Sequence, residues 1–233
     1  MILPTLLLTR PRDSAEAFVA TLDPAARAAV DILIAPLLDI RTTGAWPDLE
    51  KNAAAIFTSA NGVRFAPEGA GRQAYCVGAQ TTHRAEARGW LATQAGETAY
   101  ELMTLLKNMP PDAPLWHLGG EHTIGDIAET LTSAGVPTRH ITLYHQHLLP
   151  LNPAARDALE RPCIVPVFSP RSALHLVSEA KNLLSRAHII ALSESVAAAF
   201  AQETTAKCLV LPAPRAIYMR KAVENLCLTS SLP

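Results

Sequence analysis

The chain alternates short apolar runs with longer segments of helical periodicity over most of its length, and this alternation restricts its fold more than any other feature. The runs contain four to seven residues and lie at 3–9, 30–35, 55–58, 74–77, 114–118, 164–168, 189–192 and 208–211. Strands that are short and apolar throughout are typical of parallel sheets whose two faces are covered by crossover helices. We therefore predict an α/β fold built from parallel sheets.

The same pattern occurs twice, which predicts two similar α/β domains. Each half reads as a strand, a serine, a helix, a second strand and a small polar loop before another helix, at 56–59 with 77–82 and at 167–170 with 192–196. Two extended stretches stand outside this pattern and are suited to join two lobes. We predict a first domain formed by 1–35 and 150–233, an inserted second domain at 42–140, and linker strands at 36–41 and 141–149.

Charge and cysteine spacing exclude several classes of protein. Lys and Arg number 20 against 21 Asp and Glu, whereas a nucleic-acid-binding protein needs a basic surface. No window approaches the roughly 20 apolar residues of a membrane span. The short apolar run at the N-terminus has no basic residue before it, whereas a signal peptide begins with a positively charged region. The four cysteines lack CxxC spacing. We expect a cytoplasmic protein with no nucleic-acid or membrane partner.

The loops that follow the predicted strands are rich in serine, threonine and glycine. Because helices begin at these loops, their unpaired N–H groups favour anionic ligands, although each Ser or Thr is also an ordinary helix cap. No GxSxG, phosphate-loop, HExxH or GxGxxG motif is present. His145 and His147 share one face of an extended segment, where surface histidines are a simpler interpretation than a metal pair.

Five motifs occur in a fixed order along the chain. They are Thr9-Arg10-Pro11, Phe57-Thr58-Ser59-Ala60-Asn61-Gly62-Val63, Val77-Gly78-Ala79-Gln80-Thr81, Ile141-Thr142-Leu143-Tyr144 and Phe168-Ser169-Pro170. Together they resemble the uroporphyrinogen-III synthase family over essentially the whole chain. The resemblance implies two α/β domains joined by a two-stranded linker, with the active site in the cleft between them.

The same resemblance implies a lyase of porphyrin and heme biosynthesis. The family cyclises the linear tetrapyrrole hydroxymethylbilane to uroporphyrinogen III, inverts ring D and expels water through a spiro intermediate, using no metal and no cofactor. Hydroxymethylbilane would be the small-molecule partner, and we expect a monomer.

The resemblance also assigns roles to individual residues. Tyr144 would be catalytic, with its hydroxyl bonded to the departing hydroxyl or to the ring; the alternative is a structural tyrosine at the domain junction. Ser59 and Ser169 would cap helices and donate to substrate carboxylates. The full set of implied substrate-binding residues is Thr9, Arg10, Ser59, Ala60, Asn61, Thr81, Gly119, Gly120, Ser169, Pro170 and Ser195.

Two loops depart from the family pattern. The segment Ser193-Glu194-Ser195-Val196 replaces a Gly-Pro-Thr-Thr-like loop, and Gly119-Gly120-Glu121-His122 lies where many members carry an arginine. These departures favour one alternative, a diverged non-catalytic relative that binds a tetrapyrrole or another polycarboxylate. Two further alternatives are a small-molecule binding module unrelated to tetrapyrroles and a pair of receiver-like domains, although the latter requires an Asp at a strand end.

Overall fold

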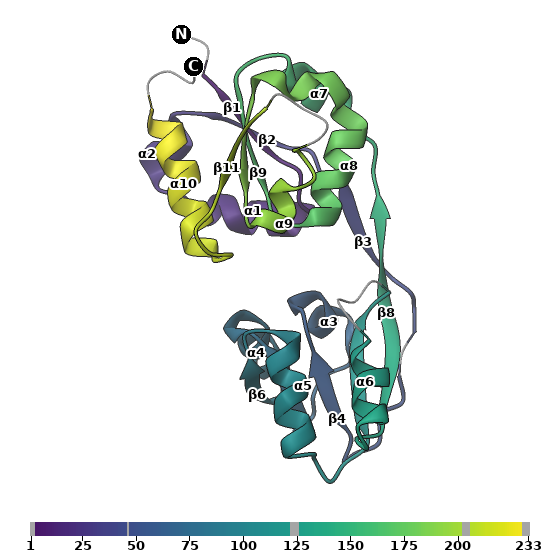
Figure 1. Cartoon of the computed structure of the whole chain (residues 1–233). Helices are drawn as coiled ribbons and strands as arrows, with labels where there is room; N and C mark the ends of the chain where they lie inside the picture. Colours follow the sequence, from purple (N-terminus) through teal and green to yellow (C-terminus); the bar gives the residue numbers. More distant parts are fainter. Residues whose placement is uncertain (1–2, 46, 122–125, 202–205, 230–233) are drawn as a thin grey trace. The chain divides into compact units, whose positions relative to one another are not determined.

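The computed structural model describes residues 3–45, 47–121, 126–201 and 206–229. Its contacts divide the chain into two compact units, which we call unit 1 (Met1–Asp39 with His147–Pro233) and unit 2 (Ile40–Gln146). Each unit contains a sheet with helices on both faces (Figure 1). The α/β class with parallel sheets is thereby confirmed, while the predicted domain limits and linker strands stay a prediction.

Unit 1 has a five-stranded parallel sheet in the order β11-β10-β9-β1-β2. Its strands are β1 (Thr5–Leu8), β2 (Asp31–Ile34), β9 (Cys163–Val167), β10 (Ala187–Ala191) and β11 (Lys207–Val210). Its helices are α1 (Arg12–Thr21), α2 (Pro24–Ala28), α7 (Pro153–Leu159), α8 (Pro170–Ala180), α9 (Glu194–Ala197) and α10 (Ala216–Leu228), with a 3-10 helix at Lys181–Arg186.

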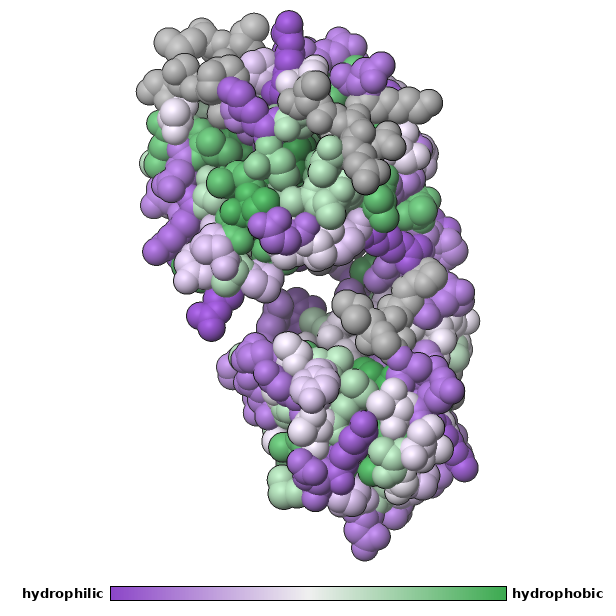
Figure 2. All heavy atoms as spheres, in the orientation of Figure 1, coloured by the Kyte–Doolittle hydropathy of each residue, from purple (hydrophilic) through white to green (hydrophobic). Residues whose placement is uncertain are grey.

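The strands of unit 1 are apolar throughout because both faces of the sheet are covered. Successive side chains of a strand point to opposite faces. Leu7 accordingly belongs to one core cluster, and Leu6 and Leu8 belong to the other. On the visible face of this unit, hydrophobic residues gather where β11 and α10 lie (Figure 2), and Leu209 of β11 is 50% exposed.

Unit 2 has a six-stranded sheet in the order β3-β8-β7-β4-β5-β6. Its strands are β3 (Leu38–Thr42), β4 (Ala54–Phe57), β5 (Gln73–Val77), β6 (Leu91–Gly96), β7 (Leu115–Gly120) and β8 (Thr138–Leu148). Its helices are α3 (Ala60–Phe65), α4 (Ala79–Glu86), α5 (Ala99–Asn108) and α6 (Ile127–Ser133). The four residues of β4 are all buried and alternate between two core clusters.

Two predicted helices differ from the structure. Asp13 with Glu16 resembles a capping box and predicts one helix over 13–29, but the structure has two helices there. Asp23 caps α2 by accepting a hydrogen bond from Ala25 N at 2.8 Å, and Pro24 starts the new helix. Pro47 is suited to the first turn of a helix and predicts a small helix there. This prediction is wrong, because described residues 47–53 form no helix. None of the described helices has the length and apolar character needed to cross a membrane.

Strand order in each unit creates a switch point where successive connections leave in opposite directions. In unit 2 the chain runs from β4 outward to β5 and β6, then returns to add β7 on the other side of β4. In unit 1 the corresponding neighbours are β1 and β9. Ligands of doubly wound sheets bind beyond the carboxyl ends of the strands at this point.

Candidate functional site

Tyr144 is a buried tyrosine on β8, and its hydroxyl lies near the switch point of unit 2. The residue is only 5% exposed. Its hydroxyl oxygen is 3.1 Å from Ser59 Oγ, at the end of β4, and its ring packs on Phe65 with centroids 5.6 Å apart. The structure therefore joins two residues that the sequence motifs place 85 positions apart.

Gly120 makes room for the Tyr144 ring. Strands β7 and β8 pair Gly119 with Thr142 and Gly120 with Tyr144, so the register shifts by one residue at Leu143. A Cβ on Gly120 would lie 2.6 Å from Tyr144 Cε2 and 2.7 Å from Cζ. Any larger residue at this position would have to move the ring.

Ser59 is held by helix α3, which it caps. Its Oγ accepts a hydrogen bond from Gly62 N at 3.2 Å. Gly62 is needed here because a Cβ at that position would lie 2.5 Å from the carbonyl oxygen of Leu118 in β7. The close approach of α3 to β7 explains why a glycine follows the capping serine three residues later.

The other predicted residues of unit 2 lie at the carboxyl ends of neighbouring strands. Ala60 and Asn61 form the first turn of α3 and are half-buried. Thr81 is buried in the first turns of α4, after β5. Because β8, β7, β4 and β5 are successive neighbours, these residues lie together at the carboxyl ends of β7, β4 and β5, with Tyr144 of β8 paired to Gly120 at the end of β7.

A pair of histidines that no sequence motif indicates lies beneath Gly119. His117 of β7 and His140 of β8 are register partners, and their ring centroids are 4.9 Å apart. Thr58 Oγ1 is 3.4 Å from His117 Nε2. Burial, with a smaller effect of His140, lowers the pKa of His117 to about 4, although Asp126 opposes the shift. Burial also lowers the pKa of His140.

His145 and His147, which the sequence places on one face of an extended segment, have different surroundings in the structure. His145 Nδ1 lies 3.0 Å from Glu121 Oε2, and His147 is exposed at the end of β8. His122 lies outside the described residues. Among the residues that the structure describes, no group of three His, Cys, Asp or Glu side chains is arranged to hold a metal ion.

Arg10 and Phe168 meet at the switch point of unit 1. Arg10 follows β1 and Phe168 follows β9, so the adjacency of these strands brings the guanidinium to 4.0 Å from the ring centroid. Phe168 in turn packs edge-on against Phe18. Burial lowers the pKa of Arg10. Within the described part of the chain Arg10 forms no ion pair, which leaves a desolvated cation available to an anionic ligand.

The remaining predicted residues of unit 1 surround these strand ends. Ser169 Oγ caps α8 by accepting from Ser172 N at 3.1 Å, and it donates to Ser172 Oγ at 2.9 Å. Pro170 is the first residue of α8. Thr9 is 2% exposed, and its carbonyl accepts a hydrogen bond from Leu37 N.

Two neighbouring residues of the loop Ser193-Glu194-Ser195-Val196, which departs from the family pattern, differ in their exposure to solvent. Ser195 is exposed and its Oγ lies 2.9 Å from Ser193 Oγ, so it is accessible to a ligand. Val196, which takes the place of a threonine, is 1% exposed and belongs to a core cluster of unit 1. The valine is therefore explained by packing.

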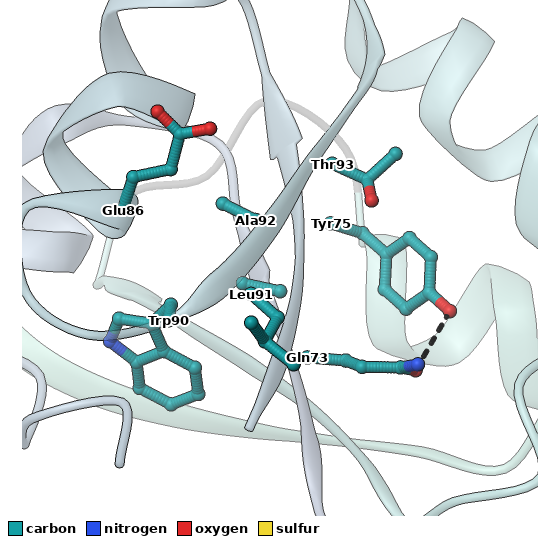
Figure 3. Close-up of a pocket in the computed structure, with 8 residues that line it drawn as sticks. Gln73, Tyr75, Glu86, Trp90, Leu91, Ala92 and Thr93 are labelled. Atoms are coloured by element: carbon teal, nitrogen blue, oxygen red, sulfur yellow. Dashed lines mark hydrogen bonds between the residues drawn. The ribbon is translucent and has the colours of Figure 1, made fainter. Parts of the chain in front are cut away.

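A hollow of about 360 Å³ in unit 2 lies at a different place (Figure 3). Most of its wall comes from the first residues of β5 and β6. It therefore lies at the amino ends of these strands, opposite the carboxyl ends described above. Tyr75 and Gln73 turn toward each other in it, and the tyrosine hydroxyl donates to Gln73 Oε1 at 3.4 Å. None of the predicted site residues lines this hollow.

Two doubly wound α/β units, each with polar side chains at its switch point, define a two-unit α/β protein suited to a small ligand with anionic groups. A family model described as uroporphyrinogen-III synthase HemD matches residues 19–216. The chain belongs to the uroporphyrinogen-III synthase family, as the sequence motifs predict.

Solved structures show the same fold at low sequence identity. Uroporphyrinogen-III synthetase from Helicobacter pylori 26695 is 13% identical with a TM-score of 0.66, over 97% of this chain and 100% of that chain. A mutant uroporphyrinogen III synthase from the extremely thermophilic bacterium Thermus thermophilus is 15% identical with a TM-score of 0.53, over 98% of this chain and 100% of that chain. No curated protein sequence matches this chain significantly.

Proposed function

We propose that this chain is a uroporphyrinogen-III synthase. In this role it is a cytoplasmic, monomeric lyase of porphyrin and heme biosynthesis. It closes hydroxymethylbilane to uroporphyrinogen III, with inversion of ring D and loss of water through a spiro intermediate. The observation that carries the proposal is the buried Tyr144 hydroxyl, held 3.1 Å from Ser59 at the switch point of a family member.

Tyr144 serves as the hydrogen-bond donor to the hydroxyl group that leaves the substrate as water. A phenol donates to a departing oxygen without being a strong acid, which suits a bilane that closes without enzyme to the symmetric isomer I. The enzyme must therefore favour one outcome by holding the chain and ring D in place. Donors fixed before the reaction in a site that excludes water are effective because they need no reorganisation.

Arg10 serves as a carboxylate anchor in unit 1. A guanidinium offers paired N–H donors that match a carboxylate, and stacking on Phe168 fixes its plane. Ser169, which caps α8, and the exposed Ser195 add polar groups at the ends of the neighbouring strands β9 and β10. The other proposed substrate-binding residues are Thr9, Ala60, Asn61, Thr81, Gly119, Gly120 and Pro170.

A coupled assay tests this function. Hydroxymethylbilane is generated in place by its synthase, the protein is added, and the oxidised products are separated into isomers I and III. We expect isomer III well above the level without protein. The Tyr144→Phe variant should lower its rate by about 10- to 100-fold while remaining folded, because one buried donor is lost. Unchanged product formation by this variant would remove Tyr144 from the mechanism.

A diverged binding protein is the second candidate, and Glu194 favours it. This exposed carboxylate lies in the first turn of α9 beside Ser195, where it repels an anionic ligand. On this alternative the folded protein yields isomer I alone, yet it binds the oxidised product uroporphyrin III, as measured by quenching of tryptophan fluorescence. Formation of isomer III by the wild-type protein decides against it.

A further inference from the structure

We propose that Ser59 is a positioning residue that acts on the substrate through Tyr144. In the ligand-bound protein its hydroxyl donates to the phenol oxygen of Tyr144, which leaves the phenol proton for the departing hydroxyl of the substrate. This inference rests on the proposed function of Tyr144. It replaces the role that the sequence motifs give Ser59, that of a direct donor to a substrate carboxylate.

The helix cap determines what the Ser59 hydroxyl has left to offer. A serine hydroxyl has one proton and two lone pairs. The N–H of Gly62, 3.2 Å from Oγ, can only donate and therefore occupies one lone pair. Donation into an oxygen also polarises its own O–H bond, which makes that hydroxyl a better donor to the next group.

The direction of the Ser59–Tyr144 bond depends on the ligand. The two oxygens are 3.1 Å apart, and either can donate to the other in the free protein. A phenol is a more acidic donor than an aliphatic hydroxyl. When a substrate oxygen accepts from Tyr144, the phenol proton is committed there, and the serine proton then bonds to the phenol oxygen. The hydrogen bonds run in one direction, from Gly62 N–H through Ser59 and Tyr144 to the substrate.

The surrounding contacts hold both ends of this chain of hydrogen bonds. Ser59 is fixed by its cap on α3. The ring of Tyr144 packs on Phe65 and occupies the space that a Cβ at Gly120 would take. The distance between the two hydroxyls is therefore set before a ligand arrives, which is what preorganisation requires.

Ser169 in unit 1 shows what the corresponding serine does without a tyrosine. It caps α8 in the same way, but its proton goes to Ser172 Oγ at 2.9 Å, a short polar side chain of the same helix. The two units thus share the capping serine, whereas the partner of its hydroxyl differs. The pairing with a buried phenol is specific to unit 2.

A double-mutant cycle with Ser59→Ala and Tyr144→Phe in the isomer III assay tests the inference. We expect Ser59→Ala to lower kcat by about tenfold with KM nearly unchanged, the effect of one hydrogen bond. In the Tyr144→Phe background the same change should have no further effect on kcat. If Ser59 instead binds a carboxylate, KM rises and the two effects multiply, which overturns the proposal.

Matched variants separate positioning from stability. Thr98→Ala removes the cap of α5, next to the outermost strand β6, and should reduce stability about as much as Ser59→Ala while leaving kcat unchanged. Ser59→Thr keeps a hydroxyl and should recover most of kcat. Ser59→Gly removes the hydroxyl in a residue that helix caps tolerate, so it replaces Ser59→Ala if that variant does not fold.

The outcomes keep the two proposals apart. A wild-type protein that forms no isomer III contradicts the proposed function. A wild-type protein that forms isomer III while the cycle is additive, or while Thr98→Ala lowers kcat as much as Ser59→Ala, contradicts the role of Ser59 alone.

Discussion

Gly120 and Tyr144 are register partners on adjacent strands, and the ring of Tyr144 occupies the space that a side chain at Gly120 would need. A Cβ at Gly120 would approach Tyr144 Cε2 to 2.6 Å, far inside van der Waals contact, and would lie 3.0 Å from the hydroxyl oxygen. The position of the phenol therefore depends on a residue that has no functional group.

Replacement of Gly120 by alanine should reduce turnover without removing any hydrogen-bonding group. The added methyl group must displace the Tyr144 ring, and the contact between its hydroxyl and Ser59 is lost with it. We expect kcat for isomer III to fall by about tenfold or more, because small misplacement of a catalytic group is costly. Steady-state kinetics in the coupled assay measure the effect.

Gly119→Ala is the comparison for this variant. Its Cβ would lie 3.2 Å from His117 Nε2 and away from Tyr144, so it strains the same strand without moving the phenol. The loss of kcat should be smaller than for Gly120→Ala at a similar melting temperature. Equal kcat values for the two variants would show that the ring contact at Gly120 is not what matters.

Much of the fold could be predicted because most buried strands appear in the sequence as short, largely apolar runs. All four residues of β4 are buried, and so are all five of β9 and of β10. The start of α3 was predicted at Ser59, whose Oγ accepts a hydrogen bond from Gly62 N, whereas the start of α2 was missed, although Asp23 accepts from Ala25 N in the same way. The helix expected at Pro47 was wrong because proline permits a first turn without requiring one.

The candidate site could be predicted only in part, because its contacts join distant segments. The motifs identify Tyr144 and Ser59 separately, but the bond between them depends on the order of β4, β7 and β8. The same holds for His117 and His140, which meet only through strand register. Phe168 stood in a recognised motif, yet its stacking under Arg10 requires that β1 and β9 be neighbours.

Arg10→Gln should weaken substrate binding more than it slows the reaction. The variant keeps a polar side chain but loses the guanidinium that stacks on Phe168. We expect KM to rise by about tenfold with a small change in kcat, and Arg10→Lys should recover only part of it because an ammonium cannot form the paired contact. Initial rates at varied hydroxymethylbilane concentration measure both constants.

Arg12→Gln serves as the control for charge near Arg10. Arg12 is two residues away, exposed, and paired with Glu16 at 3.5 Å. Exposed pairs of this kind contribute little, so neither KM nor stability should change appreciably. An equal rise of KM in both variants would indicate a general charge effect in place of a bound carboxylate at Arg10.

Val196→Thr should destabilise the protein and should not raise its activity. The valine is 1% exposed in a core cluster of unit 1, so a hydroxyl at this position would be buried. We expect a loss of about 1–3 kcal/mol in the free energy of unfolding, measured by urea denaturation. A faster variant of unchanged stability would instead favour a ligand contact at this loop.

His117 should make stability depend on pH between about 4 and 6.5. Burial holds the pKa of the folded-state imidazole at about 4, below the value of 6.5 for an unperturbed histidine. In this window the unfolded chain therefore binds a proton that the folded chain does not. The free energy of unfolding therefore has its full value, as far as His117 is concerned, above pH 6.5. It decreases as the pH falls toward 4, by up to about 3 kcal/mol for a pKa shift of this size.

The variant His117→Gln isolates this contribution from that of the carboxylates, which also titrate in acid. Glutamine does not ionise and can still form a hydrogen bond with Thr58. His140 and Asp126, the two charged or titratable groups that influence the pKa of His117, are present in both proteins. Urea unfolding of both proteins at several pH values between 4.5 and 7.5 should show a steeper decline for the wild type. If the two curves run parallel, the protonated imidazole is accommodated in the folded state, and the contact with His140 must open to admit it.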